Sequence, residues 1–174
     1  MIEAPTRHEP STTASERDML EGWLEYHRNT LLAKCAGLTD EQLRTRSVEQ
    51  SGLFLICLLR HMTIIEYAWF EKVFSGAPER MLYCSDDDPD YEINAVDDAS
   101  GDEAHAEFIR ACETSRRLTA GRSLDEVCVY PFSDETPDKE YSLRWITTHM
   151  IGEYARHNGH ADLLRERIDG ATGE

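Results

Sequence analysis

The chain has 174 residues, a length typical of one domain. Hydrophobic residues make up 40% of it and include three tryptophans, which is enough apolar surface for one core. Because 34 acidic residues outnumber 18 basic ones, the formal net charge is −16, and this charge repels a phosphate backbone or an anionic membrane. We therefore expect a small-molecule substrate, and no nucleic acid or membrane, as the partner.

The first 14 residues are polar, contain two prolines and lack the basic start and apolar run of a secretion signal. They are expected to form a disordered leader before a single domain at residues 15–170, with a tail at 171–174. The densest apolar stretch, 53–59, is too short to span a bilayer. Five scattered cysteines without a C-x-x-C pair indicate reduced thiols and a cytoplasmic protein.

Helical periodicity marks four long segments. The first covers about 15–36 and is ended by Gly37; a brief turn capped by Thr39 or Asp40 follows. The second starts at 51–52, runs to about 74 and is apolar on nearly every side, as expected for a central helix. The third covers about 102–118, and the fourth, capped by Ser142, reaches about 167.

The connections complete the predicted fold. Residues 78–101 carry six aspartates without helical periodicity and are interpreted as a long acidic crossover between the second and third helices. A linker with Pro131 and Pro137 precedes the fourth helix. Four long helices without convincing alternating strands predict an all-α fold, a four-helix bundle.

The fourth helix has a seam at alternating steps of three and four residues, the face expected to point into the bundle. Apolar residues occupy most of the seam, but three consecutive positions hold ionisable side chains, namely Glu153, His157 and His160. Burying such groups without partners costs on the order of several kcal/mol. A hydrogen-bonded core network or a register device would satisfy them, and so would a metal ion.

Residue spacing makes a metal site feasible. Glu153 and His157 stand one turn apart, so both can bind one ion at roughly 2.0 to 2.2 Å. The spacing equally allows His157 with His160. His61, near the middle of the second helix's seam, is the candidate third ligand. Two histidines and one carboxylate leave positions open for substrate, as in catalytic sites, and suit zinc, nickel, iron and manganese alike.

Three more histidines are candidates for contact with the ligands or the substrate. His149 lies at the flank of the seam and either contacts a ligand or lies on the surface. His160, if it is not itself a ligand, either orients a ligand or substrate or is structural. His27 lies on the apolar stripe of the first helix, where it either lines the pocket or is a core histidine.

Two segments carry a resemblance to a known family, residues 51–70 around His61 and residues 142–166 around the string Glu-Tyr-Ala-Arg-His-Asn-Gly-His at 153–160. They resemble the DinB-like superfamily, with the closest likeness to its actinobacterial mini-circle-type branch. The resemblance covers about residues 15–170. It implies a four-helix bundle, often dimeric, in which one histidine of the second helix and a pair on the fourth hold zinc, nickel or a similar ion.

By that resemblance the ligands are His61, Glu153 and His157, and zinc is the expected ion. Many relatives have histidine where Glu153 stands, whereas the branch of mycothiol-dependent maleylpyruvate isomerase has glutamate, as here. That isomerase carries an additional C-terminal domain that contributes to its active site. The present sequence stops at Glu174, so maleylpyruvate isomerisation itself is not implied.

Three functions are consistent with these features. The leading hypothesis is a transferase or isomerase that depends on mycothiol or a related low-molecular-weight thiol, with the metal-bound thiol as the reactive group. In the second, metal-bound water hydrolyses a small molecule. In the third, the protein is a non-enzymatic stress protein that binds a metal or ligand.

Overall fold

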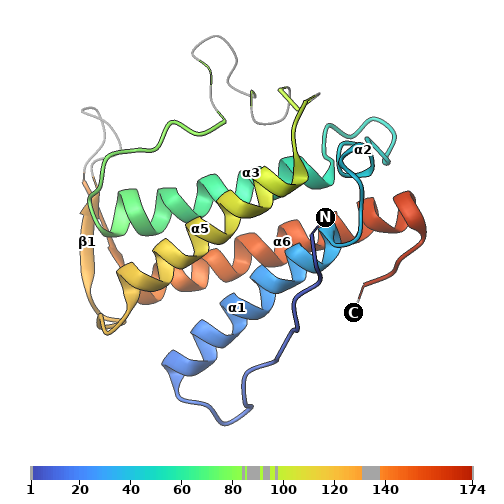
Figure 1. Ribbon diagram of the computed structural model, residues 1–174. Coiled ribbons are helices and arrows are strands. Elements are labelled where there is room, and N and C mark those ends of the chain that lie inside the picture. The colour runs from blue at the N-terminus through green and yellow to red at the C-terminus, as the bar shows by residue number, and fades with distance from the viewer. Residues whose placement is uncertain are drawn as a thin grey trace.

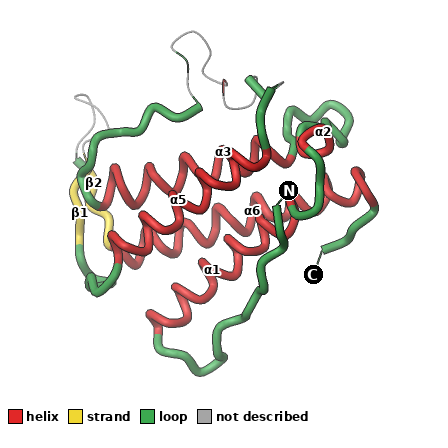
Figure 2. Tube along the Cα trace, viewed as in Figure 1, coloured by secondary structure: helices red, strands yellow, loops and turns green. Residues whose placement is uncertain are grey.

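The computed structural model describes residues 2–83, 85, 91, 95–96, 98–130 and 138–173 and is mostly helical (Figures 1 and 2). In chain order its elements are α1 (Glu16–Cys35), α2 (Asp40–Leu43), α3 (Leu55–Glu66), the π-helix η1 (Tyr67–Phe74), α5 (Gly101–Thr119), β1 (Val127–Tyr130), β2 (Lys139–Ser142) and α6 (Leu143–Asp169). No helix in these ranges is long and apolar enough to cross a membrane.

Local sequence explains most helix ends. Side-chain oxygens of Ser15, Ser100 and Ser142 accept a hydrogen bond from a backbone N–H in the first turn of α1, α5 and α6. Glycines with φ between 71° and 79° follow these helices at positions 37, 121 and 170, a conformation that glycine adopts without strain. The predicted bounds of these three helices are therefore correct to within two residues.

The second long helix differs from the prediction in two ways. It begins at Leu55 instead of at 51–52, and from Tyr67 onward it continues as a π-helix. A π-helix closes its hydrogen bonds over five residues, so it turns less per residue than an α-helix. The apolar residues of this segment carry no signal for that change, because the helix is buried on several sides and its periodicity is weak.

The long helices lie side by side as two parallel pairs (Figure 1). Glu16 and Arg144 pair at the starts of α1 and α6, and Arg165 near the end of α6 donates to carbonyl oxygens at the end of α1. The N–H of Gly101, the first residue of α5, donates to Asp40 of α2, which precedes α3. The start of α5 therefore lies near the start of α3, at the other end of that helix from η1. Of the predicted acidic crossover, the aspartates at 86–88, 90 and 97 lie outside the described residues.

A two-stranded hairpin precedes α6, and the prediction of a plain linker there was wrong. β1 and β2 pair antiparallel, with Val127 opposite Ser142 and Tyr130 opposite Lys139. Val127 and Val129 point to solvent while Cys128 and Tyr130 pack against the core. Since both faces of β1 are apolar, the sequence lacks the polar and apolar alternation that reveals a strand.

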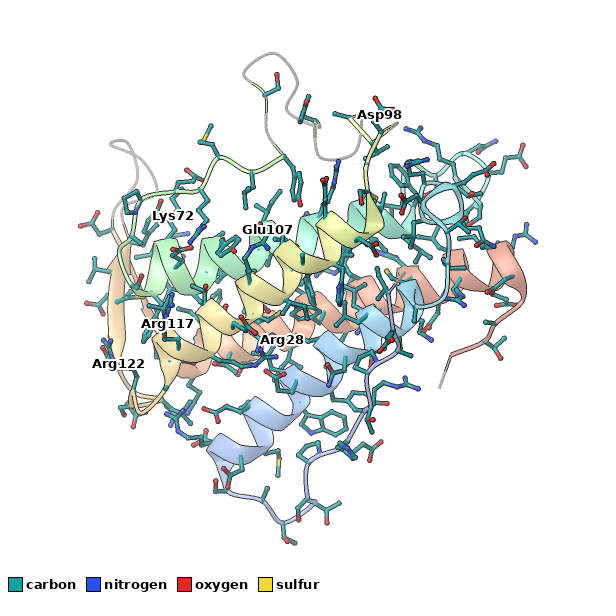
Figure 3. The ribbon with its side chains drawn as sticks, in the orientation of Figure 1. Arg28, Lys72, Asp98, Glu107, Arg117 and Arg122 are labelled. Carbon is teal, nitrogen blue, oxygen red and sulfur yellow. The ribbon has the colours of Figure 1, made fainter. Side chains whose placement is uncertain are left out.

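A buried polar network joins the four long helices in their interior. Arg28 of α1, 3% exposed, donates through Nε and Nη2 to the two carboxylate oxygens of Glu66 at 2.8 and 2.6 Å. Ser115 of α5 and Tyr154 of α6 donate to the same carboxylate at 2.6 and 2.7 Å. Figure 3 shows Arg28 inside the group of helices. Each of these four hydrogen bonds to the Glu66 carboxylate thus ties α3 to another helix.

Candidate metal centre

Three predicted residues come together where α3 lies beside α6. The donor atoms of His61, Glu153 and His157 all lie within 4.8 Å of one another. Glu153 Oε2 is 3.6 Å from His157 Nε2, and the rings of His61 and His157 are 4.8 Å apart between centroids. Two ligand atoms of a tetrahedral zinc ion are roughly 3.4 Å apart. An ion therefore fits this donor set after side-chain shifts of about an ångström.

The chemistry of the donors also suits a divalent ion. Burial, helped by the neighbouring His61 and His160, lowers the pKa of His157 to about 4, although Glu153 opposes the shift. The imidazole is therefore neutral near pH 7, and a neutral imidazole is the form that binds metals. Its Nδ1 is buried without a hydrogen-bond partner. In known metal sites, by contrast, the ring nitrogen that does not bind the ion commonly donates to a fixed acceptor.

His160 lies beside this group without joining it. Its ring is 5.4 Å from the ring of His157, and its Nδ1 is buried without a partner. Within the described ranges, the group of convergent donor atoms contains Glu153 and not His160. Residue spacing allowed either Glu153 or His160 to bind an ion together with His157. In the folded chain the geometry favours Glu153.

His149 and Arg156 lie against the other oxygen of Glu153. His149 Nε2 is 3.9 Å and Arg156 Nη1 is 3.4 Å from Oε1 of this carboxylate. One carboxylate oxygen thus faces His157 while the other faces two nitrogen groups. His149 was predicted either to contact a ligand or to lie on the surface. Its side chain adjoins Glu153, a candidate ligand, and is also 30% exposed, so it combines both features.

His27 lies in a different environment. Its Nδ1 is 3.4 Å from Nδ2 of Asn158, which also donates to the His27 carbonyl oxygen at 3.0 Å. The rings of Trp23 and Tyr26 are its aromatic neighbours, and burial lowers the pKa of its imidazole. The structure thus places His27 in a contact between α1 and α6, outside the convergent group.

An aromatic cluster, which the sequence analysis did not identify, adjoins the site. It consists of Trp69, Tyr141, Trp145 and the imidazole of His149. The Trp145 and His149 rings stack at 4.9 Å with 10° between their planes, and Trp69 lies 4.7 Å from His149. The four-residue spacing of positions 145, 149, 153 and 157 on α6 could have indicated that Trp145 and His149 lie along one face with the candidate ligands. Only the fold adds the rings of Trp69 from η1 and Tyr141 from β2.

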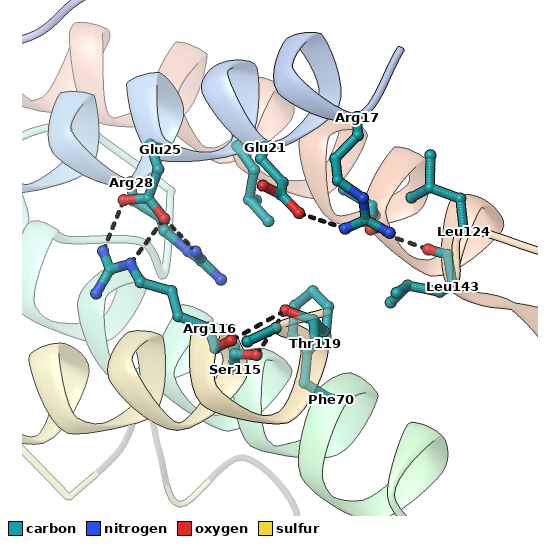
Figure 4. Close-up of a pocket in the computed structure, with 13 residues that line it drawn as sticks. Arg17, Glu21, Glu25, Arg28, Phe70, Ser115, Arg116, Thr119, Leu124 and Leu143 are labelled. Atoms are coloured by element: carbon teal, nitrogen blue, oxygen red, sulfur yellow. Dashed lines mark hydrogen bonds and ion pairs between the residues drawn. The ribbon is translucent and has the colours of Figure 1, made fainter. Parts of the chain in front are cut away.

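A cavity of about 330 Å³ lies elsewhere, between α1 and α5 (Figure 4). Its charged lining residues are paired, because Arg116 donates to Glu25 and Arg17 to Glu21 and to the Arg122 carbonyl oxygen. None of the three candidate metal ligands lines this cavity. The candidate site is therefore the donor cluster between α3 and α6.

Comparison with known proteins identifies the family of the chain. No curated protein shows significant similarity to the chain. A family model described as mycothiol-S-transferase matches residues 19–170, which include all four long helices except the first residues of α1. Since this match spans most of the sequence, the chain belongs to the mycothiol-S-transferase family.

Proposed function

We propose that the protein is a metal-dependent mycothiol S-transferase whose ion, zinc by expectation, is held by His61, Glu153 and His157. The convergence of these three donor groups is the observation that supports the proposal most strongly, and the family match supplies the thiol. A divalent ion at such a site, when bound, lowers the pKa of a coordinated thiol, so that thiolate is available at neutral pH.

The residues of the chain would contribute in separate ways. The neutral imidazole of His157 offers a lone pair instead of a positive charge, since its pKa is about 4. Glu153 offers a carboxylate whose side chain is only 16% exposed, so few water molecules compete for it. Two histidines and one carboxylate leave coordination positions open, as catalytic sites require.

The same open donor set suits activation of water, which is the basis of the hydrolase alternative. The two reactions differ in what they need. Transfer should stop when mycothiol is left out, whereas hydrolysis should continue without any thiol. A protein with bound metal and no turnover of either kind would support the non-enzymatic alternative.

Elemental analysis tests the ligand assignment. We expect stoichiometric metal in the wild-type protein and a strong loss in His157→Ala. His105→Ala is the matched control, because this histidine lies on α5 and outside the convergent group, and it should retain metal. Equal metal content in His157→Ala and the wild type would rule out the assigned ligand set.

Further parts of the proposal concern the molecule as a whole. We propose that the helices form the four-helix bundle of the DinB-like superfamily, that the protein is cytoplasmic and that it assembles as a homodimer. Sedimentation equilibrium of the purified chain tests the dimer, since a single species of monomer mass at all concentrations would contradict it.

A further inference from the structure

The aromatic cluster next to the donor group is the feature that the proposed function leaves without a role. Trp69 of η1, Tyr141 of β2 and Trp145 of α6 bring three rings within 4.9 to 5.4 Å of one another. These rings come from three separate elements, so the fold assembles the cluster. None of the cluster's residues, His149 included, belongs to the group of convergent donor atoms found in the described ranges.

The cluster retains an exposed aromatic surface. Trp145 is 45% exposed although three rings, those of Trp69, Tyr141 and His149, lie within 5.3 Å of it. Exposed tryptophan surface is costly to hydrate and is common where a ligand covers it. Among the large apolar side chains exposed on α6, Trp145 belongs to this cluster, whereas Leu163 makes none of these ring contacts.

His149 connects the cluster to the donor group. Its ring stacks on Trp145 and lies 4.7 Å from Trp69, while its Nε2 is 3.9 Å from the Glu153 carboxylate. The π-helix contributes to this continuity. Trp69 follows His61 by eight residues, and an uninterrupted α-helix would place the two side chains about 80° apart around its axis. The π-helical turns reduce that angle, so the two residues face more nearly the same side. A flat ligand on the cluster therefore lies directly beside the candidate metal centre.

The electronic character of the cluster selects a kind of ligand. Indole and phenol rings present electron-rich faces, so they stack best on rings that are poor in electrons. The carboxylate of Glu153 and the net charge of −16 disfavour anionic ligands. An uncharged, electron-poor aromatic ring is also the kind of ring that a thiolate attacks.

We propose that Trp69, Tyr141 and Trp145 form the binding subsite for the electrophile, and that this subsite selects uncharged, electron-poor aromatic electrophiles. The inference rests on the proposed function. In the reaction with an aryl halide, the mycothiol sulfur forms a C–S bond to the ring carbon that bears the halogen. The carbon–halogen bond breaks with its electron pair, halide leaves, and the thiol proton passes to solvent.

Binding without reaction tests the subsite independently of catalysis. 1,3-Dinitrobenzene is electron-poor but has no leaving group, so equilibrium dialysis with the protein as purified measures its binding alone. We expect roughly tenfold weaker binding to Trp145→Leu, which keeps apolar surface but loses the ring. Trp145→Phe, which keeps a ring, and Leu163→Ala, an exposed apolar control on the same helix, should bind as the wild type does.

Kinetics with two electrophiles complete the test. With mycothiol as the donor, we expect Trp145→Leu to lower kcat/KM roughly tenfold for 1-chloro-2,4-dinitrobenzene and to leave it unchanged for iodoacetamide, a small aliphatic electrophile. Equal losses for both electrophiles, or wild-type binding of dinitrobenzene by Trp145→Leu, would overturn the subsite. Transfer to neither electrophile by the wild type would instead contradict the proposed function, and the dialysis result would still decide the subsite.

Discussion

His157 occupies a position where a helix seam normally carries leucine, and its surroundings keep its imidazole uncharged. Burial is the main cause of its lowered pKa, with His61 and His160 adding to it. A buried neutral imidazole with an unpaired Nδ1 gains little from hydrogen bonds in the metal-free protein. The neutral imidazole is the protonation form that the proposed metal site requires.

This lowered pKa predicts how stability depends on pH when the metal has been removed. Between pH 6.5 and about 4 the unfolded chain holds a proton on His157 that the folded chain does not, so the free energy of unfolding should decrease as the pH falls. The loss should be at most about 3 kcal/mol. Urea titrations of chelator-treated protein at several pH values measure it. His157→Asn should show a flatter pH dependence, and parallel curves for the two proteins would refute the assignment.

At the scale of elements, α6 supplies a row of candidate functional side chains that turns gradually around the helix. Trp145, His149, Glu153 and His157 are four residues apart, so each is rotated about 40° from the one before. Trp145 is exposed, and the exposed side-chain fraction then falls from 30% at His149 to 16% at Glu153 and 14% at His157. One helix thus leads from an exposed aromatic surface to a half-buried donor group.

The start of this helix depends on its N-cap. Ser142 Oγ accepts a hydrogen bond from Trp145 N at 3.2 Å, and Ser142 is also the last residue of β2. We expect Ser142→Ala to lower the free energy of unfolding by about 1 kcal/mol, while Ser142→Asp should be tolerated. Thr148→Ala is the control, because this exposed hydroxyl bonds only within the helix, and urea unfolding of all three variants measures the difference. Equal effects of Ser142→Ala and Thr148→Ala would show that the cap contributes nothing.

At the scale of the whole molecule, the network around Glu66 holds the helices in register. Tyr154 follows Glu153 directly in the sequence and donates to Glu66 on α3, the helix that also carries His61. The hydrogen bond therefore connects the two helices of the candidate metal site within one residue of a candidate ligand. Glu66 is fully buried and Arg28 is nearly so, which makes this ion pair sensitive to the loss of either partner.

Removing the arginine should be severely destabilising. Arg28→Met leaves a buried carboxylate without its cation, and we expect a loss of about 3 to 5 kcal/mol in the free energy of unfolding. The double variant Arg28→Met/Glu66→Leu should recover a large part of this loss, because no unpaired charge remains. Urea denaturation of the single and double variants measures both effects. A double variant that is less stable than Arg28→Met would contradict this account of the network.

The helical character, the caps of α1, α5 and α6, and the candidate ligands His61 and His157 could be predicted from the amino-acid sequence, whereas Glu153 was preferred to His160 only through the family resemblance. These features depend on interactions within a few residues, or on ionisable side chains that stand out at apolar positions. Spacing could not choose between Glu153 and His160, because both lie within one turn of His157. Only the tertiary structure brought His61 beside that turn, shaped the π-helix and the hairpin, and gathered Trp69, Tyr141 and Trp145. Such contacts join residues far apart in the chain, and local periodicity does not record which helix faces meet.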